Sequence, residues 1–175
     1  MMFVSLGIGT VIAVVLITIV SVLTGGRVQN GTPPPALVGT TLSSLSESSL
    51  AGPTIPAPWN SHHATAVIFF ASWCGPCKTE LPALAKYLAS HSLGRVTVLG
   101  VDTQDARNAG RNVVTKDHLN FSVMFDPQST VAAGAFKLGS LPDTVFVTPR
   151  GVVQHMTIGP ITAKQFAAGV AALNA

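Results

Sequence analysis

Two cysteines, Cys74 and Cys77, are the residues of this chain best suited to chemistry. They are its whole cysteine content in 175 residues, and they stand three positions apart. Such a pair can alternate between a dithiol and a disulfide, because the thiolate of one cysteine attacks a substrate disulfide and the other then resolves the mixed disulfide. We predict that Cys74 is the nucleophile and Cys77 the resolving cysteine.

The flanking residues place this pair between a strand and a helix. The segment 66–70, AVIFF, has no polar alternation and predicts a strand covered on both faces. A helix should follow over about 76–90, since three leucines recur on one face: Leu81, Leu84 and Leu88. The free N–H groups and partial positive charge at a helix start stabilise a thiolate. Gly75 permits the tight turn, and Pro76 suits the first helical position.

Other uses of the two cysteines are weaker. A structural zinc site needs four ligands, and adjacent histidines such as His62 and His63 are poorly spaced to supply the remaining two. A purely structural disulfide would close a four-residue loop and add little stability. A peroxidase is disfavoured because the Thr-x-x-Cys setting of that chemistry is absent around Cys74.

The next elements predict a parallel pair of strands. A second buried strand is expected over 96–101, and a helix over 106–118 that Asp102 or Thr103 caps. Its inward residues would be Ala106, Ala109 and Val113. Strand, helix, strand, helix implies parallel strands joined by a right-handed crossover.

The C-terminal part predicts an antiparallel addition to this sheet. A short helix near 131–136 precedes two strands, 144–148 and 152–156, which a short turn joins into a hairpin. A final helix begins at the capping box of Thr162, and its apolar face carries Phe166, Val170 and Leu173. The fold class is therefore α/β, with a mixed central sheet flanked by helices on both faces.

The N-terminus predicts a membrane anchor over 1–27. No charged residue occurs from Val4 to Leu23, and about 20 apolar residues span a hydrocarbon core of roughly 30 Å. A cleaved signal peptide would have a basic start and a shorter apolar run. Arg27 would favour a cytoplasmic C-terminal part by the positive-inside rule, but the redox chemistry favours the opposite side, and we expect a single-pass anchor with the catalytic domain outside the cytoplasm.

A tether and N-terminal extension rich in Pro, Gly and Ser should follow over 28–58, with the catalytic domain over 59–175. Within the extension we expect a short edge strand at 36–40 and a loop over 43–49. The net charge of +3 is small and spread along the chain, which argues against a nucleic-acid partner.

The active segment resembles a known family. FASWCGPCK at 70–78 looks like the thioredoxin active-site segment, and WCGPCKTELP at 73–82 is similar to the TlpA/ResA/CcmG-like (DsbE-type) membrane-anchored thioredoxins, which carry WCxPCxxExP. The resemblance runs from about Ala36 to the C-terminus. It implies a thioredoxin fold, thiol:disulfide oxidoreductase activity without a cofactor or metal, protein thiol clients and work outside the cytoplasm.

The resemblance also assigns residues. Ile68 stands where soluble thioredoxins have a buried Asp, and Glu80 takes over as the acid near the cysteines; its ordinary alternative is a surface carboxylate of the helix. Leu141-Pro142 matches the cis-proline loop that pairs its backbone with the substrate, and a trans turn proline is the alternative. Trp73, as a wall or a core residue, would contact the client together with Gly75 and Pro76.

The direction of electron flow has two candidates. The leading one is a reductant that passes electrons from a membrane thiol carrier to client disulfides such as those of apocytochrome c, since thioredoxin with the same Gly-Pro dipeptide lies near −270 mV. Asp143, after the loop proline, points to the cytochrome c maturation branch. The alternative is an oxidase that introduces disulfides into secreted proteins. A third reading is a redox-inactive module that binds a partner.

Overall fold

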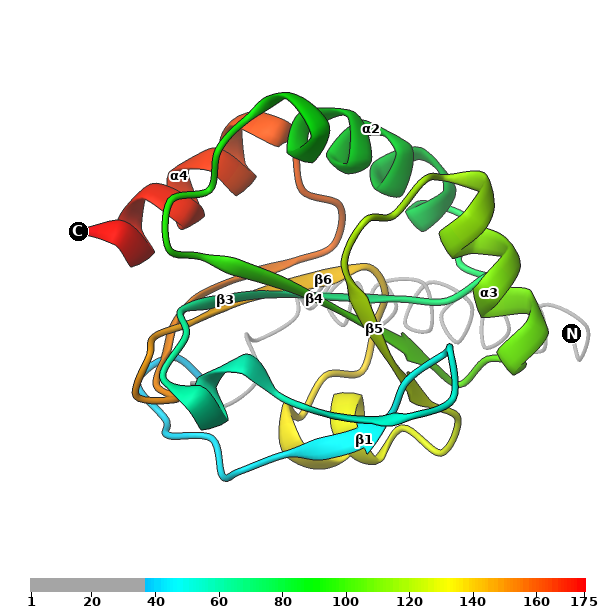
Figure 1. Ribbon diagram of the computed structural model, residues 1–175, viewed down its shortest axis with the longest axis horizontal. Coiled ribbons are helices and arrows are strands. Elements are labelled where there is room, and N and C mark those ends of the chain that lie inside the picture. Colours follow the sequence, from blue (N-terminus) through cyan, green and yellow to red (C-terminus); the bar gives the residue numbers. More distant parts are fainter. Residues whose placement is uncertain (1–36) are drawn as a thin grey trace, which may run out of the picture. The chain divides into compact units, whose positions relative to one another are not determined.

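Strand β3 (Thr65–Phe70) is the centre of the sheet in the computed structural model, which describes residues 37–175. All six of its residues are buried, as the apolar run predicts. The strands lie in the order β5-β4-β3-β6-β7 (Figure 1). Strands β4 (Thr97–Thr103) and β5 (Ser122–Asp126) run parallel to β3. Strands β6 (Asp143–Val147) and β7 (Val153–Ile158) form the antiparallel hairpin that the sequence predicts.

The two faces of the sheet are covered differently. Helices α2 (Cys77–Ser90), α3 (Arg107–Lys116) and α4 (Ala163–Asn174) pack on one face, as Figure 1 shows. On the other face lie the short helices η1 (Pro58–Ser61) and η2 (Thr130–Ala135), together with the segment that begins at Leu37 and ends before residue 46. The expected mixed sheet with helices on both faces is present, but its second face carries only short helical turns.

The helices follow their sequence signals closely. Helix α2 ends at Ser90 as expected, and the inward leucines pack in the core beneath it. Helix α4 begins at the Thr162 capping box, in which the Thr162 hydroxyl accepts a hydrogen bond from the N–H of Gln165. Phe166 and Val170 are buried and Leu173 packs beside them, so this face was predicted correctly.

Several details differ from the expectation. Asp102 and Thr103 belong to strand β4 and do not cap α3, whose N-cap residue Ala106 makes no side-chain hydrogen bond. Ala106 is exposed and precedes the helix, which begins one residue later, whereas Ala109 is half-buried and Val113 packs against the core as expected. The expected loop 43–49 contains β1 (Ser46–Ser48), which pairs with β2 (Thr54–Pro56). Strand β5 was not predicted.

The chain before β1 joins the sheet through single contacts. The expected strand at 36–40 is not a named strand, although the N–H of Gly39 bonds to Val153 and Thr41 forms an isolated bridge with Val152. Among residues 37–175 no helix has both the length and the hydropathy for a membrane span. The anchor expected over 1–27 lies outside the described residues.

Candidate active site

The two cysteines lie at the junction of β3 and α2. They are joined by a disulfide, and their Cα atoms are 5.3 Å apart. Cys74 is 3% exposed and Cys77 1%, so both cysteines are almost fully buried. The N–H of Cys77 donates to the Cys74 sulfur at 3.2 Å. Since this N–H belongs to the first turn of α2, the positive end of the helix faces the sulfur that we predict to be the nucleophile.

Trp73 forms an exposed wall beside the disulfide and is not a core residue. Its side chain is 56% exposed. The indole N–H donates to the carbonyl oxygen of Gln104 at 2.9 Å, which fixes the ring against the loop between β4 and α3. A client that approaches Cys74 therefore meets an apolar surface held in one orientation.

Glu80 lies one turn of α2 beyond Cys77 and points inward. It is 5% exposed, which excludes the surface carboxylate considered above. Its Oε2 accepts a 2.7 Å hydrogen bond from the N–H of Ile161, whereas Oε1 has no hydrogen-bond partner among the described residues. Burial raises the pKa of Glu80 from 4.5 to about 7; the Ile161 hydrogen bond lowers it and the charge of Asp143 raises it further. Such a group can take up or release a proton near neutral pH.

The Leu141–Pro142 peptide bond is cis, as the resemblance implies, and Asp143 follows it at the start of β6. The Asp143 carboxyl is fully buried and accepts from the N–H of Gly159 at 2.9 Å. Burial raises the pKa of Asp143 from 3.8 to about 6, against the lowering effect of the Gly159 and Ser140 hydrogen bonds. Glu80 and Asp143 thus take their donors from the same short segment, 159–161.

A cavity of about 290 Å³ lies between the Trp73 wall and the loop that contains Leu141. Two buried hydroxyl residues, Thr103 and Ser129, also line it. Trp73 and Leu141, both predicted as client-binding residues, therefore line one cavity. Gly75 and Pro76 form the turn between the cysteines, and Pro76 is the N-cap residue of α2.

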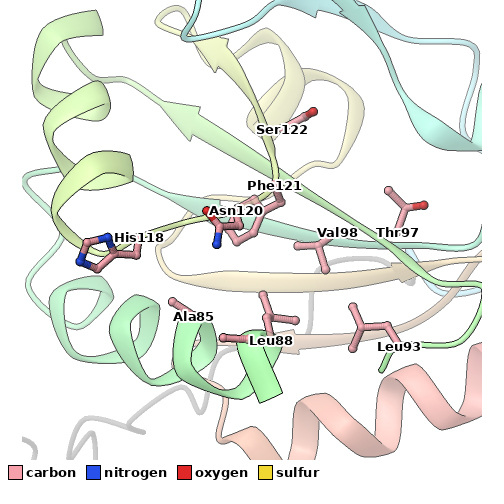
Figure 2. A pocket seen from close by; sticks show the side chains of 10 residues that line it. Ala85, Leu88, Leu93, Thr97, Val98, His118, Asn120, Phe121 and Ser122 are labelled. Carbon is pink, nitrogen blue, oxygen red and sulfur yellow. The ribbon is translucent and has the colours of Figure 1, made fainter. Parts of the chain in front are cut away.

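A larger cavity of about 410 Å³ lies elsewhere (Figure 2). It is lined by Leu88 near the end of α2, by Leu93 in the loop that follows, and by Thr97 and Val98 at the start of β4. The cysteines lie beyond the opposite end of the parallel strands, so this cavity is separate from the disulfide. Among residues 37–175 no group of three His, Cys, Asp or Glu side chains is placed to hold a metal ion.

Sequence reasoning missed two carboxyl groups behind the active segment. Asp105 accepts hydrogen bonds from the N–H and the hydroxyl of Ser72, two residues before Cys74. Asp102, at the end of β4, is fully buried. The sequence prediction names Asp102 only as a possible cap of the helix that follows β4.

Comparisons with known proteins agree with this geometry. The model of the AhpC/TSA family matches residues 52–156. The chain is 27% identical over 109 residues to sporulation thiol-disulfide oxidoreductase A of Bacillus subtilis (strain 168), which covers 61% of this chain and 66% of that relative. It is 27% identical over 136 residues to a thiol:disulfide interchange protein DsbE homolog of Paracoccus denitrificans (strain Pd 1222), covering 76% of this chain and 73% of the relative.

Further curated relatives are matched over 48% to 57% of their own length. The chain thus spans about half to two thirds of the length of these relatives. A solved structure of a secreted Mycobacterium tuberculosis disulfide oxidoreductase, homologous to E. coli DsbE, superimposes with a TM-score of 0.64 at 23% identity. The alignment covers 74% of this chain and 96% of that one, which shows a shared thioredoxin-like fold.

Proposed function

This chain belongs to the AhpC/TSA family, and from that premise we propose that it is a thiol:disulfide oxidoreductase acting through Cys74 and Cys77. The observation that carries the proposal is the disulfide at the start of α2, with Cys74 facing the helix N-terminus and the buried Glu80 one turn away. Peroxidase chemistry is less well supported, since position 71, three residues before Cys74, is Ala.

The reaction transfers two electrons and two protons to the client. The Cys74 thiolate attacks one sulfur of a client disulfide, and the other client sulfur leaves as a thiolate and is protonated. Cys77 then loses its proton and attacks the Cys74 sulfur, so that the second client sulfur also leaves as a thiolate and is protonated. The products are a client dithiol and the Cys74–Cys77 disulfide, which is the state of this structure. Glu80 is the acceptor for the Cys77 proton, and Trp73 with Leu141 holds the client.

We further propose that the protein works outside the cytoplasm as a membrane-anchored reductant. An electron donor such as a membrane thiol carrier would reduce the disulfide, and apocytochrome c cysteines are the client class that fits best. Support comes from the Gly-Pro dipeptide, from Asp143 after Pro142, and from the uncharged segment 4–23. The names of the relatives, a thiol-disulfide oxidoreductase and a thiol:disulfide interchange protein among them, support the dithiol chemistry on which this proposal builds.

Disulfide formation in secreted proteins is the alternative direction. The reduction potential of the Cys74–Cys77 pair, measured by equilibration with glutathione, separates the two. A reductant should lie near the −270 mV of thioredoxin, and a value above about −150 mV would exclude that role.

Client capture tests the activity itself. A Cys77→Ser variant should accumulate mixed disulfides through Cys74, because the resolving thiol is missing. Mass spectrometry of the trapped complexes identifies the client, and Cys74→Ser is the matched control that should trap none. Equal trapping by both variants contradicts the assigned roles. Protease added to intact cells should remove residues 65–175, and protection of them until lysis would contradict the external location.

A further inference from the structure

The cavity between Trp73 and Leu141 lies next to the nucleophile, because Trp73 is the residue that precedes Cys74. Its volume is about 290 Å³. Trp73 and Leu141 supply large apolar side chains to its lining, whereas η2 supplies the small residues Ala132 and Ala133. Larger side chains at these two positions would occupy the space. The cavity beside the disulfide therefore depends on small residues in η2.

The polar residues of the lining are joined to a buried acid. Thr103 points toward η2, since it alternates with Leu99 and Val101, which pack on that face. Its hydroxyl donates to Asp126 at 2.9 Å and lies 3.3 Å from the Ser129 hydroxyl. Asp126 is 1% exposed and accepts four hydrogen bonds in all, from the hydroxyls of Thr103 and Thr130 and from the N–H groups of Val131 and Ala132.

The cavity is uncharged, but acids lie behind it. No Lys, Arg, His, Asp or Glu is among the described residues that line it. Asp126 lies one hydrogen bond behind Thr103, and Asp143 accepts a 3.4 Å hydrogen bond from Ser140, which also lines the cavity. An acidic client side chain in this cavity would lose its hydration and be repelled by two carboxyl groups. The cavity therefore disfavours Asp and Glu.

A basic side chain gains little from the same two acids. The oxygens of Asp126 already hold four donors, and Asp143 is fully buried and accepts from Gly159 and Ser140. A Lys or Arg side chain in the cavity would therefore lose its hydration without forming a direct ion pair. Uncharged side chains remain, and the lining offers them apolar surface together with hydroxyl groups.

The register of an extended client decides which of its residues can enter the cavity. Successive side chains of an extended chain point to opposite sides, and two residues span roughly 6.6 Å. When the client cysteine points toward Cys74, its immediate neighbour in the client points away from the protein. The residue two positions from that cysteine points toward the protein again and lies within reach of the cavity.

We propose that this cavity is a subsite for one uncharged client side chain, two residues from the cysteine that Cys74 attacks, and that it rejects acidic side chains. The inference rests on the proposed dithiol function, for which it names the class of client. Ala133 and Asp126 are then specificity-determining residues: the first leaves room for the side chain, and the second supplies the charge that repels an acid.

The test uses the reduced full chain and blocked tripeptides in which glycine separates cysteine from a variable residue, on either side. Each peptide cysteine forms a mixed disulfide with thionitrobenzoate. Attack of Cys74 on the peptide sulfur releases coloured thionitrobenzoate, the better leaving group, and Cys77 then releases the peptide thiol and closes the Cys74–Cys77 disulfide. The second-order rate constant for release of the colour is compared between peptides.

In one of the two peptide directions, leucine should react about tenfold faster than glycine, because its side chain is buried. Glutamine should react about tenfold faster than glutamate, which has nearly the same shape. Lysine should react no faster than glycine. When the variable residue directly neighbours cysteine, leucine and glycine should agree within about twofold, since that side chain points away.

Two residues of η2 give a matched pair of variants. Ala133→Leu fills the cavity and should reduce the leucine-to-glycine rate ratio to below about threefold. Ala135→Leu is the control, because Ala135 is also exposed in η2 but lines a separate cavity with Trp59; it should keep the tenfold ratio.

Asp126→Asn tests the charge. It should reduce the glutamine-to-glutamate rate ratio to about threefold, and this ratio does not depend on how much of the sample is folded. If Asp126→Asn does not fold at all, Asp143→Asn replaces it and should change the ratio in the same direction.

Three results would overturn the subsite: equal rates for leucine and glycine in both directions, equal effects of Ala133→Leu and Ala135→Leu, or a lysine peptide that reacts faster than the leucine peptide. The proposed function fails separately. A reduced protein that releases no colour from any peptide contradicts the dithiol activity, whereas release at one rate from every peptide contradicts the subsite alone.

Discussion

The N–H of Ile161 donates a 2.7 Å hydrogen bond to Glu80 Oε2, across 81 residues of sequence. This bond ties the segment before α4 to the helix that begins at Cys77. It occupies one carboxylate oxygen of Glu80, while Oε1 has no hydrogen-bond partner among the described residues. A buried carboxyl group fixed on one side and open on the other is suited to exchange a proton with a neighbour.

Glu80→Gln should slow the resolving step, because Cys77 would lose its proton acceptor. We expect the variant to reduce a model disulfide at pH 7 about tenfold or more slowly than the wild type. The difference in rate should become smaller above pH 9, because the Cys77 thiol then ionises without a proton acceptor. Stopped-flow rates across this pH range measure the effect. A rate ratio between wild type and variant that does not change with pH would contradict the role.

Asp143→Asn should lower the pKa of Glu80. The charge of Asp143 raises that pKa in the wild type, so its removal has the opposite sign. Titration of the Glu80 side-chain carbon by NMR should show the midpoint moving below about 7. The Glu47→Gln variant, altered in β1, should leave the midpoint in place, and an upward shift in Asp143→Asn would refute the coupling.

Stability should fall as pH rises. Glu80, Asp143 and Asp102 have folded-state pKa values of about 7, 6 and 8, above their ordinary values of 4.5, 3.8 and 3.8. Between about pH 4 and 8 the folded chain therefore holds more protons than the unfolded chain, and the free energy of unfolding decreases with pH. The stabilising effect is complete below the unfolded values and is lost as pH passes the folded ones.

Guanidinium unfolding of the oxidised protein measures this slope. The midpoint concentration should be higher at pH 5 than at pH 8.5, and Asp102→Asn should flatten the curve above pH 6. Glu47→Gln should keep the wild-type slope. A midpoint that rises with pH would show that these carboxyl groups are ionised throughout.

Gly169→Ala should destabilise the contact of α4 with the sheet. A Cβ atom at 169 would collide with the ring of Phe146, which is buried in β6. Overpacking of this kind costs about 1–3 kcal/mol. Gly134→Ala is the matched control, because its Cβ would meet only the Ser129 carbonyl oxygen at 3.9 Å. Thermal unfolding of both variants gives the comparison, and equal effects would disprove the packing argument.

The central elements were predictable because their signals are local. The uninterrupted apolar run of β3 indicates a strand buried on both faces. The leucine spacing of α2 indicates a helix with one buried face. Strands β1 and β2 have three residues each and are mostly polar, so they carry no apolar alternation, although they pair with each other as a local hairpin. Their position could not be derived from periodicity.

The site residues themselves were predictable, but their partners were not. Cys74 and Cys77 follow from their spacing, and Glu80 and Pro142 from the family resemblance. The partners of these residues come from segments far along the chain, as with Ile161 and Glu80. Asp102 was predicted as a possible cap of the following helix, whereas it is the sixth residue of β4 and is fully buried.

The hairpin of β1 and β2 decides how short a working fragment can be. The N–H of Leu50 bonds to Val123, and Ser49 bridges Met124, so this hairpin occupies the outer side of β5. A fragment that starts at residue 59 would leave β5 as a bare edge, open to pairing with a second molecule. It would also remove Leu37 and Leu50 from the two cores. Expression of the catalytic part should therefore start before Leu37, where aggregation through β5 is avoided.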